Sequence, residues 1–284
     1  MIEPPIASPA RLADAYALLA ESSHRPIAGG TDVLVQMTAG SGTRPERLLD
    51  LWRLDELRGI DLDRDALTFG ALTTYTAIRR SSVCRDLLPA LVEAAATIGA
   101  AQIQNRGTLG GNIANASPAG DMLPILLATD ASIVVGSVRG ERTIPAVAFW
   151  TGYRTTALAA DELVVRIRIP LVADRQVRFR KVGTRRAQAI SKVILALSWV
   201  SAGPDGPWQA VRLGLGSVAE RPIRASATEA VLEGQPPTSG TADRAFVTLA
   251  GEIKPIDDVR STADYRRAVA ARVLHRLIRD AGGW

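Results

Sequence analysis

The stretch from Gln102 to Asp121 constrains the fold of this chain more than any other part of its sequence. It holds four glycines, three asparagines and a proline, and its apolar residues follow neither a helical nor a strand period. Loops of this length are uncommon inside compact chains unless they bind something. We therefore expect a long binding loop here. Its glycines would let a ligand approach the backbone, and its hydroxyl, amide and carboxylate side chains would meet sugar and phosphate oxygens.

The polar residues of this stretch also have plainer interpretations. Asp121 precedes a helical pattern over residues 122–129, so it can be a helix N-cap as well as a ligand. Asn112 and Asn115 are equally typical of turns. Arg106 is the one cation of the stretch that could hold a phosphate.

A second glycine motif, Ala28-Gly29-Gly30-Thr31-Asp32, follows a short apolar strand expected at residues 26–28. Two adjacent glycines can adopt backbone angles that turn successive N–H groups toward one point, which suits a phosphate or pyrophosphate. The same pair can equally form an ordinary turn. The motif alone leaves both interpretations open.

The composition excludes several kinds of site. Cys84 is the single cysteine, so the chain cannot form an internal disulfide, a four-thiolate zinc site or an iron–sulfur cluster. His24 and His275 are the only histidines and lie far apart in the sequence, which leaves no His/Cys ligand set for a transition metal. No nucleophile triad is legible around these three residues, and we expect each to be structural or exposed.

The charge distribution does not favour a nucleic-acid partner. The net charge is +5, but only three of the 34 basic residues are lysines, and the 31 arginines are scattered among 29 acidic residues. The longest apolar stretch, Val193 to Ala202, is too short to cross a membrane. The first twenty residues, with Glu3 and Asp14, lack the pattern of a signal peptide. We expect a cytoplasmic chain with no membrane segment.

Periodicity predicts strands and helices throughout, and 284 residues that are 47% hydrophobic can fill two or more packed units. From about residue 173, strands grouped before helices indicate a separate C-terminal α+β domain. The predicted helices are a first one that Ser8 caps and Pro9 begins, a short amphipathic stretch from Val33, and residues 86–99, 122–129, 225–232, 243–253 and 264–279. The predicted strands are 26–28, 47–51, 66–70, 131–136, 142–145, a half-solvated 163–169, 177–182, 190–200 and 211–218.

A third glycine motif, Gly214-Leu-Gly-Ser-Val-Ala219, matches a dinucleotide-binding pattern after an apolar strand. That pattern needs a helix to continue from the loop, and Pro222 lacks the N–H that the helix would require. No second strand ending in an acid follows at the expected distance. We reject this motif as a nucleotide site.

Taken together, the motifs resemble the flavoprotein subunits of molybdenum-containing hydroxylases, such as the medium subunit of aerobic carbon monoxide dehydrogenase and the FAD domain of xanthine dehydrogenase. The resemblance spans the whole chain. Its motifs, in order, are Pro26-Ile-Ala-Gly-Gly-Thr-Asp-Val-Leu, Arg106-Gly-Thr-Leu-Gly-Gly-Asn-Ile-Ala-Asn-Ala-Ser-Pro-Ala-Gly-Asp-Met-Leu-Pro, Phe179-Arg-Lys-Val-Gly-Thr-Arg-Arg-Ala, Val211-Arg-Leu-Gly-Leu-Gly-Ser-Val-Ala-Glu-Arg-Pro-Ile-Arg-Ala and Ser261-Thr-Ala-Asp-Tyr-Arg-Arg.

The resemblance implies an α+β fold of the p-cresol methylhydroxylase type. An FAD-binding domain would span residues 1–172, with subdomains at about 1–52 and 53–172. Residues 173–284 would form a domain similar to the C-terminal domain of carbon monoxide dehydrogenase flavoprotein, with a small antiparallel sheet.

The resemblance also implies a set of cofactor-binding positions but no catalytic residue and no metal ligand. The two glycine motifs would hold the FAD pyrophosphate and ribityl chain, Asp121 would accept a cofactor hydroxyl, and Lys181 and the backbone near Val164 would lie by the isoalloxazine. Leu109 stands where many members have isoleucine, and Ile98 where xanthine dehydrogenases have a phenylalanine. The implied positions are Ala28, Gly29, Gly30, Thr31, Asp32, Thr108, Leu109, Gly110, Gly111, Asn112, Asp121, Val164 and Lys181.

The function implied is electron transfer. FAD in this chain would take electrons from the two-iron two-sulfur clusters of a small iron–sulfur subunit and pass them to an external acceptor. The iron–sulfur subunit would receive these electrons from a large subunit that carries the molybdopterin cofactor. The assembly expected is a dimer of heterotrimers. The residues agree in offering a nucleotide-binding loop pair without an acid/base constellation. Two alternatives are a stand-alone FAD-dependent oxidase or dehydrogenase of the same fold, and a non-catalytic nucleotide-binding module.

Overall fold

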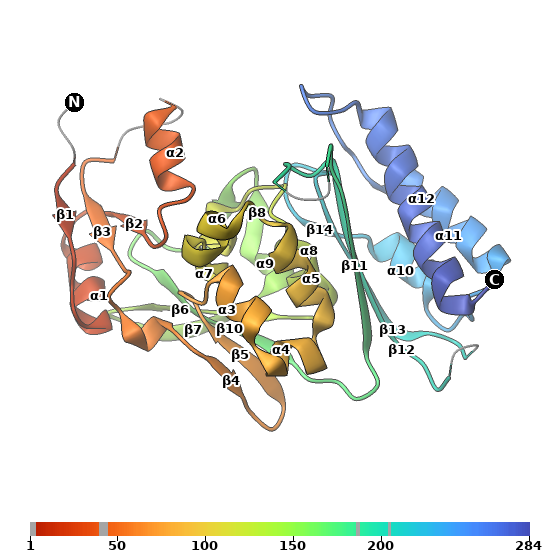
Figure 1. Cartoon of the computed structure of the whole chain (residues 1–284), viewed down its shortest axis with the longest axis horizontal. Coiled ribbons are helices and arrows are strands. Elements are labelled where there is room, and N and C mark those ends of the chain that lie inside the picture. The colour runs from red at the N-terminus through yellow and green to blue at the C-terminus, as the bar shows by residue number, and fades with distance from the viewer. Residues whose placement is uncertain (1–3, 40–44, 186–187, 204–205) are drawn as a thin grey trace.

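The computed structural model describes residues 4–39, 45–185, 188–203 and 206–284, and their strands form three main sheets that follow one another along the chain (Figure 1). The first sheet is parallel, with the order β1-β3-β2, and consists of β1 (Ile6–Ala7), β2 (Arg25–Ile27) and β3 (Leu48–Asp50). Helix α1 (Leu12–Glu21) buries Ala15 and Leu19 in a small core with this sheet. Helix α2 (Val33–Thr38) has no buried residue.

The second sheet is antiparallel, with the order β4-β5-β10-β6-β7. Its strands are β4 (Ile60–Leu62), β5 (Ala66–Gly70), β6 (Ser132–Ser137), β7 (Gly140–Pro145) and β10 (Leu163–Pro170), and the short helix η1 (Asp55–Leu57) precedes it. A separate hairpin pairs β8 (Trp150–Gly152) with β9 (Thr155–Thr156). Strand β10 is mostly buried rather than half-solvated, because Val165 packs into the core beneath α1 while Ile167 packs into the core on the other face.

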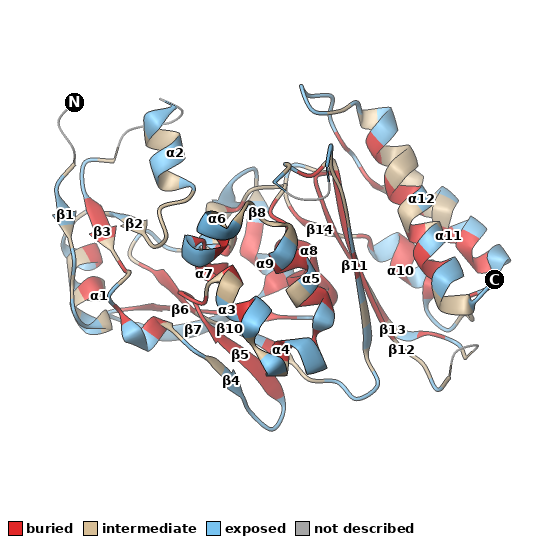
Figure 2. Ribbon diagram, viewed as in Figure 1, coloured by how far each residue is buried: buried red, intermediate tan, exposed pale blue. Residues whose placement is uncertain are grey.

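Short helices pack between the second and third sheets (Figure 1). They are α3 (Tyr75–Arg80), α4 (Ser82–Leu87), α5 (Pro89–Thr97), α6 (Ala101–Arg106), α7 (Leu109–Asn115), α8 (Leu123–Ala128) and α9 (Ala146–Phe149). One continuous core joins Phe69 of β5, Leu91 of α5 and Phe179 in the third sheet. The buried residues in Figure 2 accordingly concentrate in the middle of the molecule.

The third sheet is antiparallel in sequence order, with β11 (Gln176–Val182), β12 (Val193–Val200), β13 (Gln209–Gly216) and β14 (Ile223–Arg224). Helices α10 (Ser226–Leu232), α11 (Ser239–Glu252) and α12 (Ala263–Gly282) enclose a second core with β12 and β13. Thr262 caps the start of α12, and Gly283 ends that helix with φ +68. The mixture of helices and antiparallel sheets confirms the predicted α+β class.

The expectation of a long loop from residue 102 to 121 is wrong. Most of that stretch is helical, in α6 and α7, and Thr108 caps α7 by accepting a hydrogen bond from the N–H of Gly111 at 3.1 Å. Gly107 and Gly110 are needed for close packing rather than for a loop. A Cβ would lie 2.6 Å from the Tyr75 ring at position 107 and 2.7 Å from Ala71 at position 110.

Two predicted helices have different ends. The single helix expected over 86–99 is divided into α4 and α5, because Pro89 keeps Leu88 out of the helical region, at φ −145 and ψ 62. The first helix begins at Leu12 instead of Pro9, with Arg11 as its extended N-cap.

The rejected third glycine motif lies at the end of β13, and no helix follows until Ser226, which confirms that it is not a nucleotide loop. Its glycines let α8 approach the sheet, since a Cβ on Gly214 would lie 2.1 Å from the carbonyl oxygen of Pro124. Among the helices of the described ranges, none is both long and apolar enough to span a bilayer.

Candidate functional site

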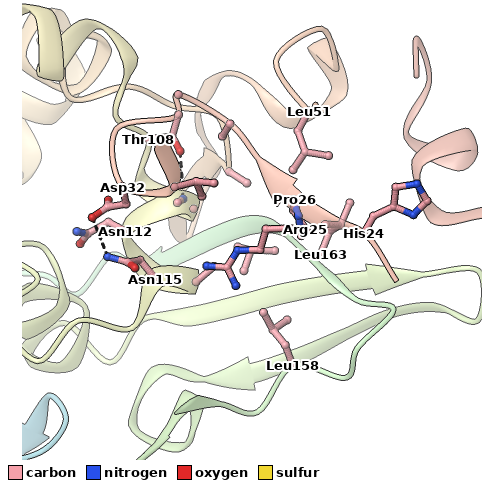
Figure 3. A pocket seen from close by; sticks show the side chains of 18 of the residues that line it. His24, Arg25, Pro26, Asp32, Leu51, Thr108, Asn112, Asn115, Leu158 and Leu163 are labelled. Atoms are coloured by element: carbon pink, nitrogen blue, oxygen red, sulfur yellow. Dashed lines mark hydrogen bonds between the residues drawn. The ribbon is translucent and has the colours of Figure 1, made fainter. Parts of the chain in front are cut away.

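A cavity of about 660 Å³ lies where the first sheet meets the second, a volume within the range of small-molecule sites (Figure 3). Residues of β2, the turn after it, α7, the β8–β9 hairpin and the start of β10 form its walls. Ten of the predicted cofactor positions line it: Ala28, Gly29, Gly30, Thr31, Asp32, Thr108, Gly110, Gly111, Asn112 and Val164. Both glycine motifs therefore border one cavity, although about eighty residues separate them in the sequence.

The first glycine motif is pressed against the second. A Cβ on Gly29 would lie 1.8 Å from the carbonyl oxygen of Arg106, so only glycine allows this approach, and Gly30 has φ +77. The backbone N–H groups of residues 29–32 donate no hydrogen bond to any described residue. Four successive donors are therefore available at the cavity, as an anionic ligand would require.

The second motif contributes side chains rather than backbone donors. At the start of α7, the N–H of Leu109 donates to Thr73 O and that of Gly110 to Ala71 O, both at 2.9 Å, while Thr108 holds the N–H of Gly111. By contrast, the side-chain oxygen of Asn112 is buried and has no hydrogen-bond partner in the described chain. This oxygen therefore has its acceptor positions left for a donor outside the described chain.

A side-chain network joins three walls of the cavity. Asn115 donates to Asp32 at 3.0 Å and accepts from Arg154 at 3.0 Å and from Gln36 at 3.3 Å (Figure 3 shows the Asn115–Asp32 bond). Burial raises the pKa of Asp32, and the charge of Arg154 and the hydrogen bond from Asn115 oppose that rise. Neither Asn112 nor Asn115 lies in a turn, since both belong to α7.

Asp121 and Lys181 do not line the cavity but form a buried ion pair with each other, with side chains 7% and 5% exposed. Lys181 also donates to the carbonyl oxygen of Thr97 at 3.3 Å. Burial raises the pKa of Asp121 to about 6, against the opposing charge of Lys181. Its second oxygen has no hydrogen-bond partner among the described residues, and Asp121 does not cap α8, whose N-cap is Met122.

The structure turns two other candidates away from the cavity. Leu109 is fully buried in the main core. Arg106, the one cation of its stretch, stacks on Trp52 with its guanidinium carbon 3.7 Å from the ring centre. Val164 does border the cavity, at an irregularity of β10 where the pairing with β6 shifts register before Arg166.

Three lining residues belong to none of the sequence motifs described above. Tyr75 opens α3, Glu162 precedes β10, and Arg154 lies in the β8–β9 turn with φ +51. Only the Arg154 segment, Gly152-Tyr-Arg, offered a clue, as an aromatic and a cation at a turn. His24, expected to be structural or exposed, also borders the cavity. Throughout the ranges that the structure describes, no cluster of three or more His, Cys, Asp or Glu side chains could hold a metal ion.

Two family models match the chain. The first, described as the FAD binding domain in molybdopterin dehydrogenase, matches residues 2–172. The second, described as the CO dehydrogenase flavoprotein C-terminal domain, matches residues 178–281.

Similar proteins cover nearly the whole chain. The glyceraldehyde dehydrogenase medium chain of Sulfolobus acidocaldarius is 32% identical over 90% of both chains. The xanthine dehydrogenase FAD-binding subunit of Escherichia coli O157:H7 is 32% identical over 96% of both. Among solved structures, a chain of carbon monoxide dehydrogenase from Hydrogenophaga pseudoflava is 31% identical, with a TM-score of 0.92 over 97% of this chain and 96% of that one. A chain of quinoline 2-oxidoreductase from Pseudomonas putida 86 is 28% identical, with a TM-score of 0.91 over 100% and 99%.

Proposed function

The chain belongs to the family of FAD-binding subunits of molybdenum-dependent hydroxylases and dehydrogenases, and from this premise we propose that it takes electrons from an iron–sulfur partner chain and passes them through FAD to an external acceptor. The proposal depends on one observation: within the described residues, the four N–H groups of residues 29–32 and the nearby side-chain oxygen of Asn112 have no hydrogen-bond partner. That donor and acceptor set fits the pyrophosphate and the hydroxyls of a flavin dinucleotide.

The residues present divide the work of holding the cofactor. The N–H groups of residues 29–32 would bind the pyrophosphate, Asn112 would accept from the ribityl chain, and Gly111 would keep space open beside it. Bound FAD would supply the oxidation–reduction chemistry. The protein's own contribution is to bind and orient.

We place the isoalloxazine end toward Val164, Asp121 and Lys181. The unpartnered oxygen of Asp121 supports a hydroxyl-accepting role.

Two titratable groups of the cavity wall, Glu162 and Tyr75, are poor candidates for a general base. Glu162 is held by Arg142 at 2.6 Å and by the N–H of Ala159 at 2.8 Å, and these bonds lower its pKa despite burial. Tyr75 keeps its proton, because burial raises its pKa far above neutrality. Glu162, a weak base already paired with Arg142, and Tyr75, which keeps its proton, are therefore poor general bases near pH 7.

We propose the following organisation. The FAD-binding domain would span residues 1–172, divided near residue 52, and the C-terminal domain residues 173–284. The three sheets support this, since their strands lie at 6–50, 60–170 and 176–224. The chain would join a small iron–sulfur subunit and a large molybdenum subunit, two such trimers would pair, and a reducing cytoplasm would suit the single free thiol of Cys84.

Anaerobic reduction of the flavin tests the proposal. The purified chain, loaded with FAD, is mixed with candidate organic substrates, first alone and then with the iron–sulfur and molybdenum chains from the same genetic locus. We expect the flavin absorbance to bleach only when the partner chains are present. Rapid bleaching by an organic substrate without them would refute the relay and support the stand-alone oxidase, and a chain that binds no flavin would indicate a non-catalytic module.

A further inference from the structure

The β8–β9 turn brings a cation to the part of the cavity where the free backbone donors lie. Arg154 borders the cavity and donates to Asn115, which in turn donates to Asp32 of the first glycine motif. Among the described lining residues, Arg25 and Arg47 are the other arginines, and neither has a side-chain hydrogen bond to Asn115, the residue that connects Arg154 to Asp32. Arg154 is therefore the arginine tied to the first glycine motif.

The guanidinium of Arg154 has capacity left for a ligand. It makes one hydrogen bond within the described residues, at 3.0 Å to Asn115, so four of its five N–H donors are unused. Its carbon also stands 5.9 Å from the ring centre of Tyr153, which helps to orient it. A planar fork with free donors is the group that best recognises phosphate oxygens.

The backbone conformation of Arg154 also supports a ligand-binding role. Its φ of +51 is in the left-handed region, which side chains other than glycine, asparagine and aspartate rarely adopt. Such conformations persist where the surroundings impose them, and they concentrate at ligand clamps. The β8–β9 turn thus keeps Arg154 at the cavity in a backbone conformation that arginine rarely adopts.

Charge balance supplies the remaining argument. Asp32 places an exposed carboxylate within the same motif as the four N–H groups that have no partner among the described residues, and that charge alone would repel a diphosphate. Arg154 already acts on this carboxylate, since its charge opposes the rise in the pKa of Asp32. An anion at residues 29–32 therefore needs a cation nearby, and Arg154 is in place to provide it.

We propose that Arg154, in the β8–β9 turn, binds the diphosphate of the cofactor together with the backbone N–H groups of residues 29–32. This rests on the proposed function, because it assumes that the cavity takes a flavin dinucleotide. It goes further in naming a charged group that neither glycine motif contains.

The test compares two substitutions in the full-length, cofactor-free chain. Arg154→Lys keeps the charge, whereas Arg154→Gln loses it but can still donate to Asn115. Isothermal titration with ADP, FAD and riboflavin measures binding, and thermal unfolding verifies that each variant folds. Arg80→Gln, at an exposed position outside the cavity lining, is the matched control.

If Arg154 binds the diphosphate, Arg154→Gln weakens ADP and FAD by about tenfold or more, whereas Arg154→Lys stays within about threefold of the wild type and riboflavin is unaffected by either. If Arg154 only anchors Asn115, the glutamine variant binds ADP at least as well as the lysine variant, and the proposal is overturned. Unchanged ADP binding in both variants also overturns it. A wild-type chain that binds no flavin would instead refute the proposed function itself.

Discussion

Gly110 and Gly111 are neighbours in α7, yet the structure gives them opposite tasks. A Cβ on Gly110 would lie 2.7 Å from both Cβ and the carbonyl oxygen of Ala71, inside the core. A Cβ on Gly111 would meet only Thr108 Oγ1, at 2.8 Å, and would otherwise stand in the cavity. Adding one methyl group at each position therefore separates folding from cofactor binding.

For Gly110→Ala we expect a loss of stability. Forcing an extra methyl group into a packed core costs about 1–3 kcal/mol, which corresponds to a lower Tm by roughly 2–10 °C in a chain of this size. For Gly111→Ala the helical preference of alanine contributes up to about 1 kcal/mol, and strain on the Thr108 cap costs about the same. The cofactor-free Gly111→Ala chain should thus melt within about 2 °C of the wild type.

Cofactor affinity should show the reverse order. We assume that a methyl group at position 111 weakens cofactor binding by the amount that an extra methyl group costs in a packed core, about 1–3 kcal/mol. The Kd for FAD then rises by about 5- to 150-fold. Fluorescence titration with FAD measures the Kd, and circular dichroism of the cofactor-free chains measures Tm. Gly111→Val should be soluble and largely free of flavin. Full FAD affinity in Gly111→Ala, or a loss of affinity confined to Gly110→Ala, would show that position 111 of α7 does not face the cofactor.

Three further outcomes are expected. Acid precipitation should release the flavin as intact FAD, so recovery of FMN, or of colour that stays on the protein, would contradict the assignment. Because burial raises the pKa of Asp121 to about 6, the folded cofactor-free chain binds that proton more tightly than the unfolded chain, and this group makes stability fall as pH rises from about 4 to 6. Asp121→Asn should remove that decline. The stability of the variant relative to the wild type should therefore rise with pH from about 4 to 6, as measured by thermal unfolding. Asp130 accepts from Arg212 at 3.0 Å and Arg224 at 3.1 Å and is 36% exposed, so Asp130→Asn should lower the free energy of unfolding by about 1–2 kcal/mol. Asp14→Asn, at an exposed ion pair, should leave it unchanged, and equal effects of the two would contradict the role of Asp130.

The strands and the C-terminal helices could be predicted because their apolar residues repeat at the period of the element. Helix α12 buries Ala270, Leu274, Leu277 and Ile278 along one face, as its pattern indicated. The same rules failed for α6 and α7, where Gly107 and Gly110 look like helix breakers. Their purpose is close contact with Tyr75 and Ala71, residues that are distant in sequence, and no local pattern records such a contact.

The candidate site divides in the same way. The glycine motif at residues 28–32 carried its own signal, since adjacent glycines after a strand suit an anion. That both motifs border one cavity depends on the packing of Gly29 against Arg106, which is a tertiary fact. Arg154 was missed because its place follows from the backbone of a short hairpin rather than from neighbours in sequence.

The close approach of Pro124 to Gly214 limits how such chains can exchange parts by recombination. If two related genes are joined near residue 172, helix α8 comes from one parent and strand β13 from the other. A Cβ at position 214 of β13 would lie 2.1 Å from the carbonyl oxygen of Pro124 in α8. A chimera that takes its third sheet from a relative would keep the contact between α8 and β13 only if the relative also has glycine at position 214. Exchange of α11 and α12 leaves this contact untouched, although these helices share their core with β12 and β13. Crossovers after β14 therefore preserve the Pro124–Gly214 contact, whereas crossovers between β10 and β11 preserve it only when the donor of β13 has glycine at position 214.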